Sequence, residues 1–499
     1  MFACVRNRDI GIFRKRAINN REEEGRPSVI PERANGRADL FMTTLIKNGT
    51  IITATDTYKA DILVKNGTIS EIGREISKIA SEIIDAADKW VLPGAVDPHT
   101  HMDSQCDGMT TVDDFETGTA AAAAGGTTTV IDYAEQAPGV SLTQTLEDWK
   151  AKAASRAIVD YGFHMALSEV NPSVLGEIPG IVEAGVSSFH VSLDGHGERH
   201  INDAELIEFL QCTGSAGALA CIHAENGEII DLFLRRLVAE GKTSAKFISA
   251  ARPPEVEAQA TARVISLAEM AKAPIYLTNL SSAHAIEKVK AARDRGLVVY
   301  AETCSHYLTI SGDRYEEPEG IKFYCAPPLR SCWHGDILWK AIASGDIQTV
   351  GSDHRAFSYA GQKDLGIENF TLAPRGFPGI QERISAICSK GVHTGKISAN
   401  RLVDLVSTTP AKLFGLFPRK GTLAVGSDAD MIIFDPKAEM TLSKALALSR
   451  SDYTPYEGMK VRGATWLVLL RGKVIARESK VMGRSGGGEF LSRTKFTLP

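Results

Sequence analysis

The stretch "WVLPGAVDPHTHMD", residues 90–103, decides how this chain is interpreted. Its apolar run is typical of a buried strand, and two histidines, His99 and His101, follow at the strand's end. Side chains alternate along a strand with period two, so both imidazoles point to the same face. Two imidazoles on one face can bind one metal ion, whereas the alternative is a polar strand end with two unrelated histidines.

Seven further apolar runs follow this first strand, and helical stretches separate them. The runs are "TTTVIDYA" (127–134), "VDYGFHMAL" (159–167), "VSSFHVSL" (186–193), "ALACIHAEN" (218–226), "APIYLTNLSS" (273–282), "LVVYAETCSH" (297–306) and "IQTVGSDH" (347–354). Among the helical stretches is "PPEVEAQATARVISLAEMAK" (253–272). Strands that alternate with helices form a parallel sheet, and about eight of them predict a closed (β/α)8 TIM-type barrel in the α/β class.

Both ends of the chain have a different pattern. "TLIKNGTIITATDTYKADILVKNGTISEIG" (44–73) is made of short alternating strands with two Asn-Gly turns, a strong hairpin signal. The stretches 420–436 and 461–479 have the same character. We therefore expect a small β-sandwich-like domain built from residues 42–93 and 416–480, with the barrel at 94–415 and a tail at 481–499 in subunit contacts.

The first 41 residues are rich in charges of both signs and have no apolar periodicity. They predict a disordered N-terminal extension, or sequence upstream of a start at Met42, and the alternative is an arm packed on a neighbouring subunit. Whether they belong to the native protein is left open.

The bulk composition excludes several classes of protein. The net charge of −5 over 499 residues gives no electrostatic reason to bind nucleic acid. No apolar run approaches the roughly 20 residues that span a bilayer. The eight cysteines are scattered, with no Cys-x-x-Cys pair, which favours reduced thiols and a cytoplasmic protein.

Polar residues stand at or near the ends of several predicted barrel strands. His190 lies in the fourth, His223 ends the fifth, Asn279 ends the sixth and Asp353 ends the last. Active sites of such barrels lie at the C-terminal ends of the strands. With the His-x-His pair at the end of the first strand, this gathering favours a metal site over a chance polar strand end.

Over residues 42–499 the chain resembles the amidohydrolase superfamily, and within it the dihydropyrimidinase and hydantoinase family of cyclic-amide hydrolases. The stretches that carry the resemblance include "VLPGAVDPHTHMD", "AGGTTTVIDYA", "HAENGEII", "AETCSHYL", "GSDHRAFSYAGQKDLGIENFTLAPRGFPGIQER" and "SDYTPYEGMKVRG". The resemblance implies a barrel with a companion β-domain, a homotetramer, a small-molecule substrate and a site with two zinc ions bridged by a carbamylated lysine.

The metal ligands that the resemblance implies are partly changed in this chain. Four positions are intact: His99, His101, His223 and Asp353. The lysine position is His190 and the histidine position on the sixth strand is Asn279. Imidazole cannot be carbamylated, and an amide is a poor zinc ligand beside histidine. We therefore expect one divalent metal, zinc by ligand type, on His99, His101 and Asp353 with His223 or His190.

The residues that would hold the substrate have changed as well. Gly195 stands at the position of an oxyanion-binding tyrosine, and Ala326 and Arg375 replace a serine and an asparagine that contact the cyclic ring. Asn279, Arg355, Arg375 and His196 are the candidate substrate-binding residues. Two arginines near one barrel mouth suggest an anionic ligand, so plain dihydrouracil and hydantoin should be poor substrates.

The leading hypothesis is a metal-dependent hydrolase of a C–N bond in a cyclic amide or imide, with Asp353 as general base for the attacking water. One alternative is a mononuclear, deaminase-like enzyme. The other is a non-catalytic scaffold that keeps the fold and has lost ligands. The sequence names neither the substrate and pathway, nor the metal, nor the stereochemistry.

Overall fold

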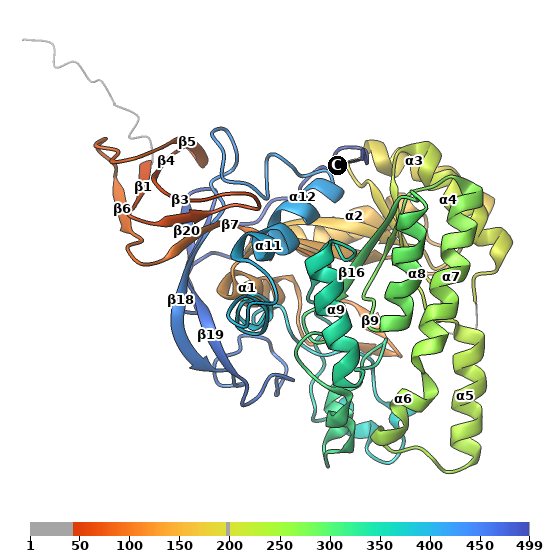
Figure 1. Cartoon of the computed structure of the whole chain (residues 1–499). Coiled ribbons are helices and arrows are strands. Elements are labelled where there is room, and N and C mark those ends of the chain that lie inside the picture. Colours follow the sequence, from red (N-terminus) through yellow and green to blue (C-terminus); the bar gives the residue numbers. More distant parts are fainter. Residues whose placement is uncertain (1–42, 196–199, 499) are drawn as a thin grey trace, which may run out of the picture. The chain divides into compact units, whose positions relative to one another are not determined.

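A computed structural model describes residues 43–195 and 200–498 (Figure 1). The expectation for residues 1–41 lies outside these ranges. At the centre, eight parallel strands form one sheet, in chain order around the ring: β8 (Ala95–Thr100), β11 (Thr127–Glu135), β12 (Asp160–Ala166), β13 (Ser188–Ser192), β14 (Leu219–His223), β15 (Ile275–Leu277), β16 (Val299–Cys304) and β17 (Thr349–Gly351). The predicted (β/α)8 barrel is therefore confirmed.

The seam between the last and the first strand is closed by contacts just beyond β17. Thr100 and His354 form a parallel bridge, and His101 donates its backbone N–H to the His354 carbonyl at 2.9 Å. The backbone N–H of Ser352 donates to the buried Asp97 carboxylate at 3.1 Å. Because the seam joins the His-x-His segment to the segment around Asp353, barrel closure brings both halves of the predicted site together.

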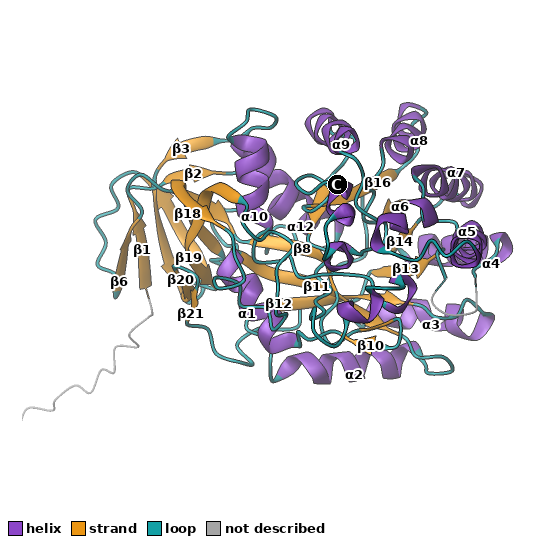
Figure 2. Ribbon diagram, turned by 90° about the horizontal axis from the view of Figure 1, so that it is seen from below, coloured by secondary structure: helices purple, strands orange, loops and turns teal. Residues whose placement is uncertain are grey.

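Helices surround this ring (Figure 2). They are α1 (Phe115–Gly125), α2 (Leu142–Ala154), α3 (Pro172–Glu183), α4 (Asp203–Ala216), α5 (Gly227–Ala239), α6 (Ile248–Ala251), α7 (Pro254–Ala271), α8 (Ala283–Asp294), α9 (Cys332–Ser344), α10 (Arg383–Ile387), α11 (Ala399–Val403) and α12 (Thr409–Leu413). Since helices cover the outside, the strands are buried on both faces, which explains their continuous apolar runs such as that of β11. No helix in the described part of the chain is long and apolar enough to cross a membrane.

Local signals set the helix ends. α1 begins at the N-cap Asp114, whose carboxylate accepts from the backbone N–H of Glu116 and Thr117, while the Thr117 hydroxyl completes a capping box. The helix ends at Gly126, which has φ 101°, a left-handed conformation that glycine adopts without strain. This tight stop lets the chain enter β11 directly.

The companion domain is built from both chain ends, as predicted. One sheet has the order β5 (Thr68–Gly73), β4 (Asp61–Lys65), β1 (Thr43–Lys47), β6 (Glu82–Asp85). The other has the order β21 (Lys480–Val481), β20 (Lys473–Arg477), β19 (Lys460–Leu470), β18 (Met431–Thr441), β7 (Trp90–Pro93), β2 (Thr50–Ile52), β3 (Thr57–Lys59). Antiparallel pairing of β7 with β18 joins the two halves, and a buried aliphatic cluster lies between the sheets.

The C-terminal tail packs on its own barrel. Residue Tyr161, at the start of β12, exchanges backbone hydrogen bonds with Glu489 (2.9 Å) and Leu491 (2.7 Å). Leu491 is 1% exposed, and the Phe490 ring lies 6.0 Å from that of Phe163. The tail's apolar side chains therefore pack at the N-terminal end of the chain's own barrel. Subunit contacts by residues 481–499 stay a prediction.

This packing predicts the effect of a substitution in the tail on the stability of the chain. Leu491→Ala removes a fully buried side chain and should cost about 2–5 kcal/mol of stability, which lowers the apparent Tm in a thermal melt. Leu498→Ala is the matched control, since Leu498 is 66% exposed and should melt like the parent. Equal melting temperatures for the two variants would contradict a structural role of the tail in its own barrel.

Candidate active site

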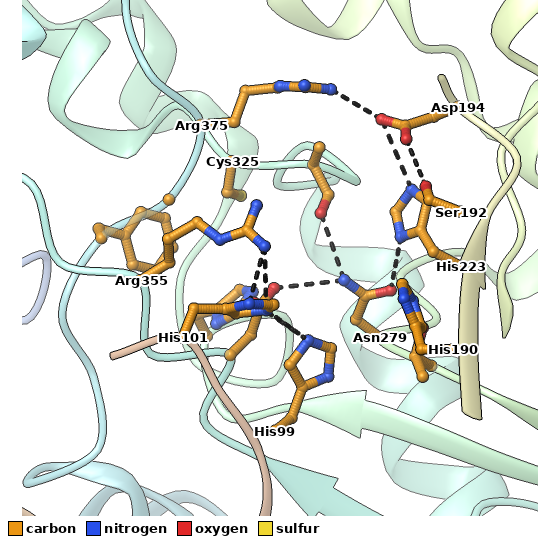
Figure 3. Close-up of a pocket in the computed structure, with 16 residues that line it drawn as sticks. His99, His101, His190, Ser192, Asp194, His223, Asn279, Cys325, Arg355 and Arg375 are labelled. Carbon is orange, nitrogen blue, oxygen red and sulfur yellow. Dashed lines mark hydrogen bonds and ion pairs between the residues drawn. The ribbon is translucent and has the colours of Figure 1, made fainter. Parts of the chain in front are cut away.

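A small cavity opens at the C-terminal ends of the barrel strands, where such barrels carry their chemistry (Figure 3). Its volume is about 40 Å³. Nearly all of its lining residues come from the barrel strands or the loops that follow them: His99, His101, His190, Ser192, Asp194, His223, Thr278, Asn279, His306, Cys325, Ala326, Asp353, Arg355, Arg375, Gly376 and Phe377. All the described candidate residues from the sequence therefore meet in one place. His196 lies outside the described residues.

The His-x-His pair and Asp353 form a compact triad of donor atoms. His99 Nε2 lies 3.1 Å from His101 Nε2 and 3.3 Å from Asp353 Oδ1, and His101 Nε2 lies 3.5 Å from the same oxygen. Tetrahedral zinc with bonds of about 2.0–2.1 Å holds neighbouring donor atoms about 3.3 Å apart. The triad thus fits a single divalent metal.

A buried carboxylate behind the triad orients His99. Glu302, on β16, accepts the Nδ1 hydrogen bond of His99 at 2.6 Å and is fully buried. A proton held on Nδ1 leaves the Nε2 lone pair free to face the cavity, as in many metal-binding histidines. Burial lowers the pKa of His99, but the charges of Glu302 and Asp353 outweigh it and raise the pKa to about 9. The site therefore attracts a cation at this nitrogen.

The backbone is strained where the strands end at the cavity. Asp353 has φ 49° and Asn279 has φ 42°, both in the left-handed region that favours glycine. Aspartate and asparagine tolerate this region better than most residues, and such strain concentrates at functional sites. Burial raises the pKa of Asp353, yet the histidines and Arg355 hold it well below its usual range. The resting form of Asp353 is therefore the carboxylate.

His223 lies on the far side of Asn279 from the triad. Its Nδ1 is 2.9 Å from Asn279 Oδ1, and its Nε2 is 3.1 Å from Glu225. His223 forms a second group of possible metal ligands with Asp194 and Glu225. The carboxylates of these two residues also face the guanidinium of Arg252. Burial lowers the pKa of His223, but Asp194 and Glu225 outweigh it and raise the pKa. The structure does not bring His223 to the triad.

His190 stands at the position that the resemblance assigns to the lysine. It lines the cavity, with the Tyr133 ring edge-on at 4.8 Å between centroids. Burial and the neighbouring histidines keep its pKa well below the ordinary value, so the ring is neutral. Among the described residues it belongs to none of the groups of donors that lie within 4.8 Å of one another. Metal binding by His190 stays a prediction.

Asn279 links the two halves of the site. Its Nδ2 lies 3.3 Å from Asp353 Oδ2 and 3.3 Å from the carbonyl of Ala326, while its oxygen faces His223. Both polar atoms of its side chain have partners in the chain. Asn279 therefore positions Asp353 and the cavity wall, and its predicted contact with the substrate stays untested.

The two predicted arginines differ in their partners. Arg375 pairs with Asp107 at 2.7 Å and with Asp194 at 2.7 Å, so two carboxylates already balance its charge. Arg355 lies over His101, with Nη2 2.8 Å from Nδ1 and 3.2 Å from Nε2 of that ring. Figure 3 shows the Arg375–Asp194 pair across the upper part of the cavity and Arg355 turned toward His101.

Several residues of the site were not found from the sequence. They are Glu302, Tyr133, Asp194, His306 and Cys325. Glu302 stands in "AETCSHYL", two residues before Cys304. Because side chains alternate along a strand, the two residues share a face, and this alternation could have predicted that Glu302 points into the barrel. Asp194 lies in a loop, where no periodic pattern predicts direction.

A parallel barrel with a His-x-His pair and an aspartate at its strand ends is the arrangement found in barrel metalloenzymes.

The amidohydrolase family model matches residues 90–475. D-hydantoinase of Geobacillus stearothermophilus is 45% identical over 458 residues, 91% of this chain and 97% of that protein. The structure of a dihydropyrimidinase from Brevibacillus agri has a TM-score of 0.90 at 42% identity, covering 92% of this chain and 100% of that one. The L-hydantoinase of Arthrobacter aurescens has a TM-score of 0.84 at 31% identity, covering 90% and 99%. This chain belongs to the amidohydrolase family, and its resemblance to hydantoinases and dihydropyrimidinases is confirmed.

The contact between Glu302 and His99 generates a prediction about metal affinity. Glu302→Gln keeps the shape and loses the charge, so zinc affinity should fall about 10- to 100-fold, measured by zinc titration against a competing chelator. Glu240→Gln is the control, because Glu240 is 56% exposed and far along the chain from the triad. An affinity of Glu302→Gln equal to that of the control would show that Glu302 does not act through His99.

Proposed function

We propose that this protein is a metal-dependent hydrolase of a C–N bond in a cyclic amide, with one zinc ion per chain. The observation that carries the proposal is the donor triad, whose spacing of 3.1–3.5 Å suits one tetrahedral ion. Family membership and the identity to hydantoinases support the reaction class. A divalent metal held there supplies Lewis-acid activation of water for attack on the amide carbonyl.

Two residues of the chain have roles in the proposed reaction besides metal binding. Asp353 is the one carboxylate of the triad, so it is our candidate to accept the proton of the attacking water and return it to the leaving nitrogen. Asn279 holds Asp353 in place by its amide at 3.3 Å.

A single metal, rather than two, is favoured by three features of the site. His190 cannot carry the carbamate that bridges two ions in the relatives implied by resemblance. Asn279 replaces a histidine ligand, and the carboxylates near His223 are already matched by Arg252.

The same geometry bears on the two alternative functions. A deaminase-like reaction would need His223 beside the triad, and its ring faces Glu225 instead. A scaffold would not need the buried Glu302–His99 pair.

The metal content tests this proposal. Elemental analysis of the purified protein should give about one zinc per chain, and a chelator should abolish ring opening until zinc is returned. Turnover is measured on a panel of five- and six-membered cyclic ureides, with and without a carboxylate, by mass spectrometry of the opened product. Two tightly held metals would contradict the mononuclear site, and a zinc-loaded protein that opens no ring would contradict the hydrolase.

We also propose a homotetramer in the cytoplasm. The support for assembly is helix α5, which buries only Gly227 and Ile230 in its own chain and leaves Leu232 37% and Val238 46% exposed. The support for a reducing compartment is that all cysteines in the described residues are free. We propose no nucleic-acid or membrane partner.

The apolar side of α5 gives the test of assembly. Val238→Asp places a charge on an exposed apolar surface, which costs a single chain little but should disrupt a subunit contact there and lower the particle mass in light scattering. Val425→Asp is the control, since Val425 is 65% exposed in the companion domain. A parent of monomeric mass would contradict the tetramer, and an unchanged mass of Val238→Asp would remove α5 from the interface.

A further inference from the structure

One cation beside the active site forms no ion pair with a carboxylate in the described part of the chain. Arg355 lines the cavity and is half-buried. Among the described residues no carboxylate lies within 4.0 Å of its guanidinium, and its Nε has no hydrogen bond. Its remaining contacts are the Cys106 thiol at 3.4 Å and the ring of His101. Neither of these neutralises a guanidinium, and the charges of Glu135 and Asp353 act on it only from beyond 4.0 Å.

The other arginines at this site are different. Arg375 is held by two carboxylates, and Arg252 bridges Glu225 and Asp194. A guanidinium taken out of water is costly unless a carboxylate or comparable acceptor faces it, and these two satisfy that rule. The charge of Arg375 is therefore balanced within the chain, and its predicted contact with an anionic substrate stays a prediction. Arg355 is the cation that a ligand can still pair with.

The place of Arg355 limits what that ligand is. The guanidinium reaches to 2.8 Å from His101, which belongs to the donor triad, so any anion it binds lies beside the reacting centre. A divalent metal on the triad would add positive charge at the same place, which increases the need for a negative group there. A planar fork of N–H donors matches a carboxylate in a bidentate way.

We propose that the substrate is a cyclic amide that bears a carboxylate, on the ring or one carbon from it, and that Arg355 binds this carboxylate. The inference rests on the proposed function and names the substrate class of the same site. The cavity of about 40 Å³ holds no such ring in its present form, so binding requires side chains at the mouth to move. Displacement of the guanidinium from His101 by the incoming carboxylate opens part of this space.

The test compares pairs of rings that differ only by a carboxylate. Orotate and uracil resist hydrolysis and serve for calorimetric binding to the zinc-loaded protein, while 4,5-dihydroorotate and dihydrouracil serve for turnover. Each pair is measured on the parent, Arg355→Met, Arg355→Lys and the control Arg74→Met, whose side chain is exposed in the companion domain. Zinc content is determined for every protein.

We expect the parent to bind orotate at least about tenfold more tightly than uracil, since a charge-assisted bidentate pair is strong. Arg355→Met should weaken orotate binding at least about tenfold more than it weakens uracil binding, and Arg355→Lys should keep part of the preference. Arg74→Met should behave like the parent. The same pattern is expected in kcat/KM for the two dihydro rings.

Two results would overturn the inference. One is a parent without preference for the carboxylated ring. The other is an equal loss on both rings in Arg355→Met at full zinc content, which would assign Arg355 to the reacting amide instead. A zinc-loaded protein that prefers orotate through Arg355 but opens no ring would support this inference while contradicting the proposed hydrolase, so the two failures are distinguishable.

Discussion

The geometry of the site depends on one buried carboxylate, that of Glu302. It accepts hydrogen bonds from His99 at 2.6 Å, from the backbone N–H of Asn279 at 3.1 Å and from the Tyr276 hydroxyl at 2.7 Å. A charge without water is stable only with such partners, so its loss would release several elements at once. Because β8 and β16 are not neighbours in the sheet, this contact across the barrel exists only when the ring is closed.

Charge balance around the cavity divides the basic residues into two kinds. Arg252 and Arg375 belong to a network with Asp107, Asp194 and Glu225, which ties together loops that follow different strands. Such a network orders the mouth of the barrel and offers little net charge to a ligand. Arg355 stands outside it, beside the triad, so its positive charge acts directly on the proposed metal site.

Much of the fold and part of the site could be predicted from the sequence, because both follow from periodicity. Eight apolar runs separated by helices predicted the barrel, and the period of two placed His99 and His101 on one face. The pattern could not tell which way the ring of His223 turns, since that depends on Glu225 and Asn279. Nor could it distinguish Arg355 from Arg375, whose partner Asp107 is distant in sequence. The pattern also could not show that the tail packs on its own barrel, since its partner Tyr161 precedes it by more than 300 residues.

The tail has a consequence for how the chain is made. Residues 489–493 pair with the start of β12 and place Arg493 beneath the barrel, where it donates to Ser188 at 2.9 Å. In the companion domain, β7 likewise pairs with β18, which follows it by more than 300 residues. Residues 489–493 are made after every barrel strand that they contact, so the finished barrel cannot assemble in step with translation. Long-range pairing of this kind folds slowly and exposes unpaired strand edges to other chains in the meantime.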